Sequence, residues 1–220
     1  MSARLICAAL ALACLATTAP AKADSSGRVG AQNAAAPTSP DVFGTAAVAA
    51  GVTFYDSRFR RVSNTDNAHP LVLKMAQGLT GMTPEQQLTA VFNEVKQKVR
   101  WSSDLDTMRV ADLWANAGET LERGAGDSED IATVEMQVLK AAGWNPRDLY
   151  ISIGRVRRVG THIVLLARAP SGFYVLDDRA NRPVATQEYH AFTPIMTLGV
   201  GKSWIHGRRI YGASGRLSAR

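Results

Sequence analysis

The stretch Gly124-Ala125-Gly126-Asp127-Ser128-Glu129-Asp130 places two glycines before a serine that acidic residues flank on both sides. The glycines predict a turn, and acidic residues favour the first turn of a helix, where the helix dipole is positive. We expect this helix to run from Ser128 to Gly143, because glycine suits the left-handed conformation that ends helices. Apolar residues at helical spacing predict that one face is buried. They are Ile131, Val134, Val138 and Leu139.

A second helix is predicted upstream, from Thr83 to about Arg100. Thr83 is a suitable N-cap, Pro84 fits the first helical position, and Gln86 completes a capping box. Apolar residues then recur at helical spacing and predict a buried face. These residues are Leu88, Val91, Phe92, Val95 and Val99.

After Pro146 the pattern changes to short runs of β-branched and aromatic residues, which indicate strands. We predict strands over Leu149–Val156, His162–Arg168 and Phe173–Leu176, with a further one over Phe192–Leu198. Pro170-Ser171-Gly172 predicts a hairpin turn between two of them. Helices followed by an antiparallel sheet favour an α+β fold, with the helices packed on that sheet.

Three residues in these elements suggest a catalytic site. Ser128 begins a helix, where free backbone N–H groups favour an ionised nucleophile and a developing oxyanion. His162 opens one strand and Asp177 closes the next, so the two can meet across the hairpin, with the acid orienting the imidazole. Each residue also has an ordinary explanation: a helix cap, a hydrogen-bonded strand histidine and a turn residue. The pattern alone leaves both interpretations open.

The sequence also resembles the bacterial transglutaminase-like cysteine proteinases, the family that includes the periplasmic LapG proteases. The resemblance covers roughly residues 85–185. Its motifs are Asp112-Leu113-Trp114, Glu119-Thr120-Leu121, the Gly124 to Asp130 stretch, Gly143-Trp144, His162-Ile163-Val164-Leu165 and Val175-Leu176-Asp177. The resemblance implies a papain-like, transglutaminase-type α+β core.

By position, the resemblance assigns Ser128 to the place of the nucleophilic cysteine, His162 to the base and Asp177 to the orienting acid. Asp178 stands where the family usually has asparagine. Trp114 has two interpretations: packing in the core, which we favour, and a contribution to the edge of a substrate cleft. The proline that often follows this tryptophan in relatives is missing, which leaves the shape of that wall open.

A serine at this position changes the chemistry that the family motif implies. A thiol readily ionises, whereas a hydroxyl must lose its proton to His162 during the attack. Three hypotheses follow. The chain is a hydrolase that cuts a peptide or acyl bond with Ser128, or a catalytically inactive relative that binds a peptide or an envelope protein in the retained cleft. The third is a structural domain without a ligand.

The acidic residues around Ser128 suggest a calcium site. Calcium prefers several oxygen ligands, and the family resemblance implies calcium dependence, with Asp127 and Glu129 as the expected ligands. Asp130 lies on the same turn, and Asp104 and Asp106 lie upstream. Plain stabilisation of the helix N-terminus is the alternative.

The N-terminus has the pattern of a secretory signal over residues 1–23. Arg4 provides a positive charge, Leu5–Ala16 is almost entirely apolar, and Ala21-Lys22-Ala23 has small residues where signal peptidase cuts. An uncleaved anchor is the weaker alternative, because the cleavage site is well formed. No later apolar run is long enough to span a membrane. We therefore expect a periplasmic or secreted protein.

Residues 24–40, rich in alanine, serine, glycine and proline, predict a disordered linker, and residues 41–220 a single peptidase-like domain. Both cysteines, Cys7 and Cys14, lie in the predicted signal. The mature chain would then contain no thiol and no disulfide, so its site could not use sulfur.

The net charge and the positions of the histidines argue against nucleic acid and zinc as ligands. Removing residues 1–23 lowers the net charge from +6 to +4, that is, 23 basic minus 19 acidic residues. The basic group Arg155, Arg157 and Arg158 is interpreted as a solvated turn rather than a nucleic-acid surface. The remaining histidines lack the spacing of a zinc site. They are His69, His190 and His206.

Overall fold

The computed structural model describes residues 38–64, 68–107, 109 and 113–208. These residues belong to one compact unit, Ala36–Arg220. The predicted signal, most of the predicted linker, Asp112 and the end of the chain lie outside the described residues. No helix in the described part is long and apolar enough to cross a membrane.

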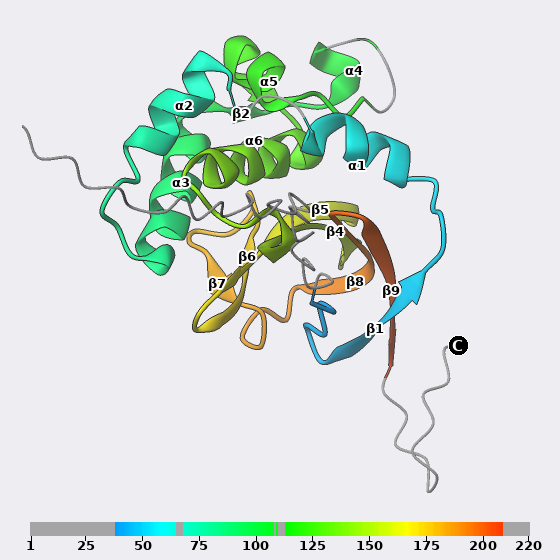
Figure 1. Cartoon of the computed structure of the whole chain (residues 1–220). Helices are drawn as coiled ribbons and strands as arrows, with labels where there is room; N and C mark the ends of the chain where they lie inside the picture. The colour runs from blue at the N-terminus through cyan, green and yellow to red at the C-terminus, as the bar shows by residue number, and fades with distance from the viewer. Residues whose placement is uncertain (1–37, 65–67, 108, 110–112, 209–220) are drawn as a thin grey trace, which may run out of the picture. The chain divides into compact units, whose positions relative to one another are not determined.

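A seven-stranded antiparallel sheet forms one layer of this unit, in the order β1-β9-β8-β4-β5-β6-β7 (Figure 1). Its strands are β1 (Thr45–Ala50), β4 (Leu149–Val156), β5 (Gly160–Ala169), β6 (Gly172–Leu176), β7 (Val184–Ala185), β8 (Phe192–Gly199) and β9 (Lys202–Arg208). The four predicted strands are all present, and the predicted turn at Pro170 joins β5 to β6.

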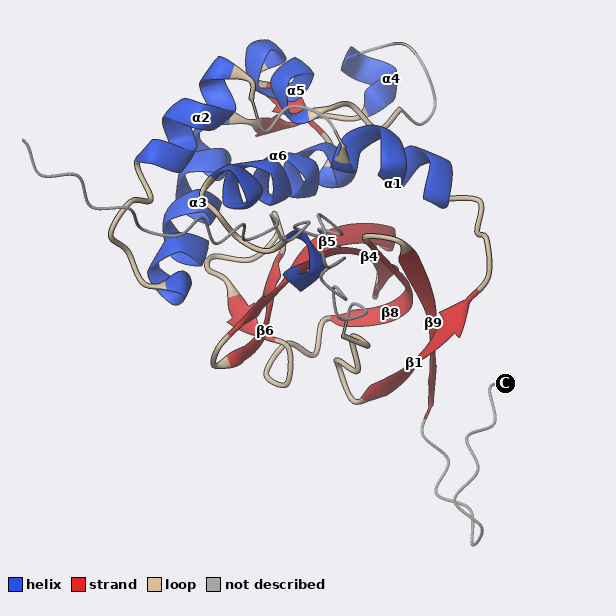
Figure 2. Cartoon of the chain, viewed as in Figure 1, coloured by secondary structure: helices blue, strands red, loops and turns tan. Residues whose placement is uncertain are grey.

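Helices form the second layer, on one side of the sheet (Figure 2). The α-helices are α1 (Asp56–Ser63), α2 (Pro70–Gln77), α3 (Pro84–Lys98), α4 (Asp104–Thr107), α5 (Ala117–Arg123) and α6 (Ser128–Ala141), with a 3-10 turn over Pro146–Asp148. The central helix α6 packs on β4 and β5, and α1, α2, α3 and α5 surround it. A separate pair of short parallel strands, β2 (Arg100–Trp101) and β3 (Ala125–Gly126), joins the end of α3 to the start of α6. The predicted α+β class is confirmed.

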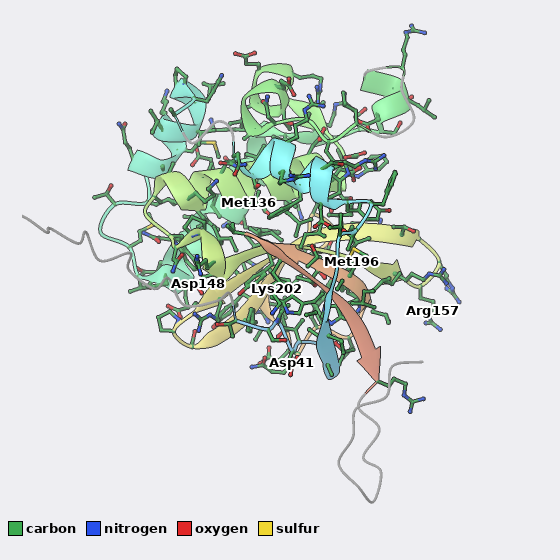
Figure 3. All side chains as sticks on the ribbon, turned by 45° about the vertical axis from the view of Figure 1, so that its right-hand side comes forward. Asp41, Met136, Asp148, Arg157, Met196 and Lys202 are labelled. Carbon is green, nitrogen blue, oxygen red and sulfur yellow. The ribbon has the colours of Figure 1, made fainter. Side chains whose placement is uncertain are left out.

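Alternation along the central strands separates two clusters of buried side chains. Leu149, Ile151 and Ile153 of β4 belong to the large cluster shared with the helices, whereas Tyr150 belongs to a smaller cluster with Trp204. Successive side chains of a strand point to opposite faces, so both faces of the central strands are covered. Arg157 projects from the β4–β5 turn, outside these layers, whereas Met136 of α6 is buried (Figure 3).

The ends of the two predicted helices follow their capping residues. The Thr83 side chain accepts a hydrogen bond from Gln86 N–H, and the Thr83 N–H donates to Gln86 Oε1, which forms the expected capping box. At the end of α6, Gly143 has φ +97. The Trp144 N–H donates to Leu139 O and the Gly143 N–H to Lys140 O. This is the paired hydrogen bonding of a Schellman motif.

The order of elements along the chain corrects one expectation. Strand β1 precedes all the helices and pairs with β9 at the sheet edge, from Thr45↔Arg208 to Ala50↔Ser203. The run Thr45-Ala46-Ala47-Val48-Ala49-Ala50 is poor in the large β-formers that mark strands. Pairing with β9, a long-range contact, makes it a strand.

His206 links three strands of this edge. From β9, its Nδ1 lies 2.7 Å from Thr45 Oγ1 on β1, and its Nε2 lies 2.8 Å from Thr197 Oγ1 on β8. Burial lowers the pKa of His206 to about 4, although Asp41 acts in the opposite direction. The imidazole is therefore neutral in the folded protein at neutral pH.

This histidine is expected to make the fold sensitive to acid. The unfolded chain binds its proton near pH 6.5 and the folded chain near pH 4, so stability falls as pH drops between these values, by up to about 3 kcal/mol. Urea unfolding of wild type and His206→Gln at several pH values measures the difference. The variant should lose less stability on acidification, whereas the exposed His190→Gln should behave as wild type. Equal pH dependence in wild type and His206→Gln would contradict this role.

Candidate active site

Ser128 occupies the first position of α6, directly after the short strand β3. Pairing of β3 with β2 holds the chain before the helix, with Trp101 level with Gly126. A Cβ at Gly126 would come within 2.7 Å of the Asp130 side chain, so only glycine fits this approach. The backbone N–H groups of the first turn of a helix have no partners within the helix. The Ser128 side chain therefore lies at a helix end with free donors.

His162 and Asp177 come from neighbouring strands. The β5–β6 ladder ends with Leu165 opposite Leu176. Continuing this register by one residue places Asp177 opposite Val164. His162 lies two residues before Val164 in β5, so its side chain points to the same face of the sheet as that of Val164. Diagonal neighbours of this kind lie within reach of long side chains. The expected meeting of these two residues across the hairpin is observed.

The three predicted residues form one hydrogen-bonded chain. Ser128 Oγ lies 3.2 Å from His162 Nδ1, and His162 Nε2 lies 2.9 Å from Asp177 Oδ1. Their exposed fractions are 9%, 5% and 0%. With Nε2–H donating to the carboxylate, Nδ1 presents its lone pair to the serine hydroxyl. This arrangement can remove a proton from Ser128 and stabilise the resulting imidazolium.

Further contacts keep Asp177 ionised. Burial alone would raise its pKa, but the hydrogen bond and charge of His162, with donors from Tyr189 and Arg179, hold the pKa below its usual value. Tyr189 Oη donates to Oδ2 at 2.6 Å and the Arg179 N–H to Oδ1 at 2.8 Å. Sequence reasoning missed Tyr189, because nothing in the pattern near position 189 connects it to the hairpin.

A second carboxylate lies beside the imidazole. Asp178 Oδ1 is 3.4 Å from His162 Nε2, and this oxygen is buried without a hydrogen-bond partner. Burial raises the pKa of Asp178, and the charge of Asp177 adds to the increase, while His162 and a hydrogen bond from the Ser128 side chain oppose it. The Ser128 hydroxyl thus has two acceptors within reach, the imidazole and this carboxylate.

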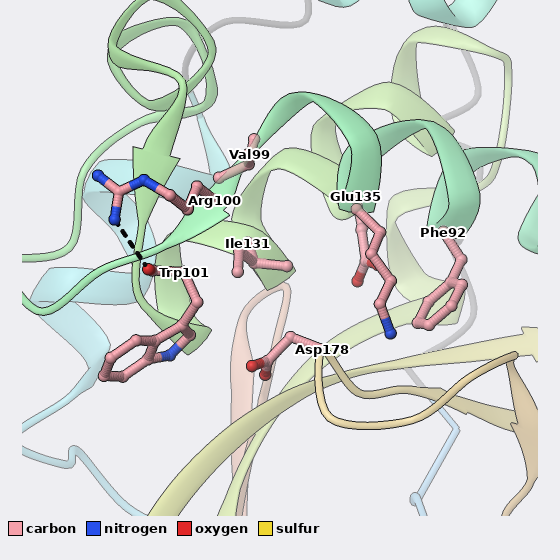
Figure 4. A pocket seen from close by; sticks show the side chains of 8 residues that line it. Phe92, Val99, Arg100, Trp101, Ile131, Glu135 and Asp178 are labelled. Carbon is pink, nitrogen blue, oxygen red and sulfur yellow. Dashed lines mark hydrogen bonds between the residues drawn. The ribbon is translucent and has the colours of Figure 1, made fainter.

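A cavity of about 230 Å³ opens beside Asp178 (Figure 4). It lies between α3, β2, α6 and the turn after β6. Its lining consists of Phe92, Lys96, Val99, Arg100, Trp101, Ile131, Glu135 and Asp178. Trp101, with 56% of its side chain exposed, stands at its edge. Sequence reasoning assigned no role to Trp101 or Glu135.

Trp114 packs in the core and is not among the residues that line this cavity. Only 2% of it is exposed, and it belongs to the large core cluster, with its ring stacked on Tyr55 at a centroid distance of 6.0 Å. The packing alternative holds for this residue. The tryptophan at the cavity is Trp101, which the β2–β3 pairing brings there.

Three acidic residues on the other side of Ser128 form a cluster. Ligand atoms of Asp104, Asp127 and Glu129 lie within 4.8 Å of one another. One oxygen each of Asp104 and Asp127 is buried without a hydrogen-bond partner. Asp127 is the N-cap residue of α6, but its side chain makes no capping hydrogen bond. Burial, and then the charges of Glu129 and Asp104, raise the pKa of Asp127 to about 8. Oxygen ligands crowded in this way suit a hard cation.

The other two acidic residues of the sequence pattern lie outside this cluster. Asp106 accepts a hydrogen bond from Ser103. Asp130 is fully buried and pairs with Arg123, whose Nη2 lies 2.9 Å from Oδ2, and accepts a hydrogen bond from Ala115 N at 2.8 Å. Asp130 therefore ties α5 and the preceding loop to α6.

Comparison with known proteins agrees with this geometry. The sequence pattern of the bacterial transglutaminase-like cysteine proteinases (BTLCP) matches residues 61–194, more than half of the chain. The chain belongs to this family. The only cysteines of the sequence, Cys7 and Cys14, lie outside the matched region. No protein of curated function matches the sequence.

Solved structures of LapG from Legionella pneumophila resemble this fold. The calcium-bound form gives a TM-score of 0.55 at 19% identity, covering 74% of this chain and 90% of that one. The EGTA-treated form gives 0.54 at 19% identity, covering 68% and 84%. A likeness at this level of identity concerns the fold, and it confirms the expected papain-like, transglutaminase-type core of a BTLCP protein.

Because Asp130 is buried and pairs with Arg123, replacing Arg123 should strongly destabilise the protein. Arg123→Met should reduce the free energy of unfolding by about 3 kcal/mol, because the Asp130 carboxylate stays buried without its counter-charge. Chemical denaturation measures this effect. The exposed Arg182→Met should change stability by less than about 0.5 kcal/mol. A similar small effect at Arg123 would mean that the pair does not hold α5 to α6.

Proposed function

We propose that this BTLCP protein is an exported hydrolase that cuts a peptide or acyl bond with Ser128 as its nucleophile. The observation that carries the proposal is the buried hydrogen-bonded chain from Ser128 through His162 to Asp177. The family, named for its proteinases, supports a peptidase fold as the framework. The predicted signal supports action in the periplasm or outside the cell, on a peptide or an envelope or surface protein.

The proposed reaction begins with the attack of Ser128 Oγ on the carbonyl carbon of the scissile bond, while the hydroxyl proton moves to His162 Nδ1. Asp177 stabilises the imidazolium through Nε2–H. The oxyanion of the tetrahedral intermediate is stabilised by the free N–H groups at the start of α6. His162 then gives the proton to the leaving group. A water molecule, deprotonated by the same nitrogen, hydrolyses the acyl-serine.

Serine demands more of the base than cysteine does. A thiolate forms in a Cys–His pair before the attack, whereas a hydroxyl loses its proton only during the attack. The shorter C–O bond also moves the nucleophile back from a carbonyl group positioned for sulfur, and reaction rates respond to such displacements. The hydrogen bonds that Asp177 receives from Tyr189 and Arg179 support an ionised partner for His162.

A binding protein without catalysis is the second candidate function. It is favoured by Asp178, which stands beside both His162 and the Ser128 side chain. A serine hydroxyl has one proton to donate. If that proton rests on Asp178, the Ser128 oxygen has no base, and the retained cleft would hold a peptide without cutting it.

Labelling with a fluorophosphonate, followed by intact-mass measurement, separates the two functions. In a hydrolase, the mature protein gains one adduct that maps to Ser128. Ser128→Ala should abolish the adduct, and His162→Ala should slow its formation about a hundredfold or more, because the general base is lost. Ser171→Ala, a change of an exposed serine, should label as wild type. A folded wild-type protein that forms no adduct would favour the binding protein.

A Ser128→Cys variant provides a direct measure of the site. The mature chain would then carry a single thiol, since both natural cysteines lie in the predicted signal. His162 and the α6 N-terminus should lower the pKa of this thiol. Its alkylation by iodoacetamide at pH 6 should therefore be faster than in the double variant with His162→Ala. Equal rates would mean that His162 does not activate position 128.

We also propose that Asp104, Asp127 and Glu129 hold a calcium ion. The support is the pair of buried carboxylate oxygens without partners, and the burial and neighbouring charges that together raise the pKa of Asp127. A LapG structure of the same fold is described as calcium-bound. A calcium ion here would offset most of the negative charge of these three carboxylates next to the nucleophile and would fix α4, which begins at Asp104, against α6.

Thermal unfolding with calcium tests this site. If 1 mM calcium is about a hundred times the Kd, it should raise Tm by about 5 °C relative to EGTA. Asp127→Asn should abolish most of this shift, yet in EGTA the variant should be at least as stable as wild type, because a source of repulsion is gone. Asp106→Asn, outside the cluster, should keep the calcium response. A wild-type Tm that calcium does not change would refute the site.

A further inference from the structure

Glu135 is a buried acid on the same helix as the nucleophile candidate. Ser128, Ile131 and Glu135 recur at helical spacing and therefore lie along one face of α6. Only 2% of Glu135 is exposed, and its side chain lines the cavity beside Asp178. Figure 4 shows Glu135 and Ile131 extending from α6 toward Asp178. The cavity thus extends from Asp178, which follows Asp177 in the chain, to a second acid.

Among the described residues, Asp178 Oδ1 is buried without a hydrogen-bond partner, and Glu135 is a buried acid whose carboxyl group faces other carboxylates and no paired cation. Burial raises the pKa of Glu135 well above its usual value, and the charges of Asp178 and Asp177 add to the increase. A buried acid without a partner costs free energy. Glu135 and the unpaired oxygen of Asp178 face one cavity, and both would be stabilised by a cationic group that enters between them.

The cations of the cavity itself are engaged elsewhere. Lys96 Nζ donates to the Ala180 carbonyl, which fastens the turn after β6 to α3. Arg100 Nη1 contacts Trp101 O at 3.4 Å, at the edge of the cavity. Neither forms an ion pair with Glu135 or Asp178 among the described residues.

The size and walls of the cavity suit a long side chain. Its volume of about 230 Å³ corresponds to roughly seven water molecules at ~30 Å³ each, more than a lone ion needs. Phe92, Val99 and Ile131 provide apolar walls for an aliphatic stem. The exposed ring of Trp101 at the edge can contact a cation as it enters.

We propose that this cavity is a subsite for the lysine or arginine side chain of a peptide bound beside Ser128, with Glu135 and Asp178 as the groups that pair with its charge. The inference rests on the proposed function in one respect, that a peptide lies along the cleft. It does not require that the peptide is cut. It assigns to the cleft a preference for basic segments of an envelope or surface protein.

Calorimetry with the Ser128→Ala variant tests the subsite without turnover. The probes are acetyl-Gly-Gly-Arg-Gly-Gly-amide and the same peptide with citrulline, which has a similar shape but no charge. The arginine peptide should bind about tenfold or more tightly than the citrulline peptide. Adding Glu135→Gln should remove most of this difference, and adding Asp178→Asn should reduce it. Glu188→Gln, an exposed change of equal charge, should preserve it.

The possible results decide between the proposals. Equal affinities for the two peptides, no binding of either at millimolar concentration, or full discrimination retained in a folded Glu135→Gln protein would each overturn the subsite. If Glu135→Gln does not fold, the Asp178→Asn result decides in the same way. Selective arginine binding together with absence of labelling at Ser128 would keep the subsite and reject the hydrolase. Labelling at Ser128 without a preference for the arginine peptide would support the hydrolase and reject the subsite.

Discussion

Burial of α6 between the sheet and the other helices is the constraint on which the rest of this structure depends. The helix packs on β4 and β5, and its polar residues are buried along with its apolar ones. Each of these polar groups has to meet a partner or a cavity. Gln137 donates to Val62 O, and Asp130 pairs with Arg123. The same packing directs Ser128 toward His162 and Glu135 toward the cavity.

The carboxylates around the start of α6 divide into two groups with different surroundings. On one side, hydrogen bonds stabilise Asp177 as an anion, while burial beside a cavity raises the pKa of Asp178 and of Glu135. On the other side, Asp104 and Asp127 have buried oxygens without partners. Acids of one residue type thus differ in pKa according to burial and neighbouring charge. Both groups lie next to Ser128, which connects the proposed chemistry to two proposed cation sites.

Local sequence patterns were sufficient to predict the helices that have clear capping residues and the strands that are rich in β-branched residues. The capping box at Thr83, the glycine at position 143 and the β-branched runs from Leu149 onward all predicted elements that the structure contains. Strand β1 had no such signal, because alanine-rich sequence becomes a strand only when a partner offers a ladder of hydrogen bonds. The sequence left two places open for Trp114, because a tryptophan suits both a core position and the wall of a cleft, and the structure places it in the core.

By itself, the sequence determined the α+β class, the family, and the positions of Ser128, His162 and Asp177 at element ends, because capping, alternation and motif order are local properties of the chain. Tertiary structure alone decided which acids meet. It brought Asp104 to Asp127, turned Asp130 to Arg123 instead, placed Tyr189 on Asp177, and opened a cavity between Glu135 and Asp178. These contacts join residues from different elements, and their geometry depends on how helices and strands pack, which no local pattern encodes.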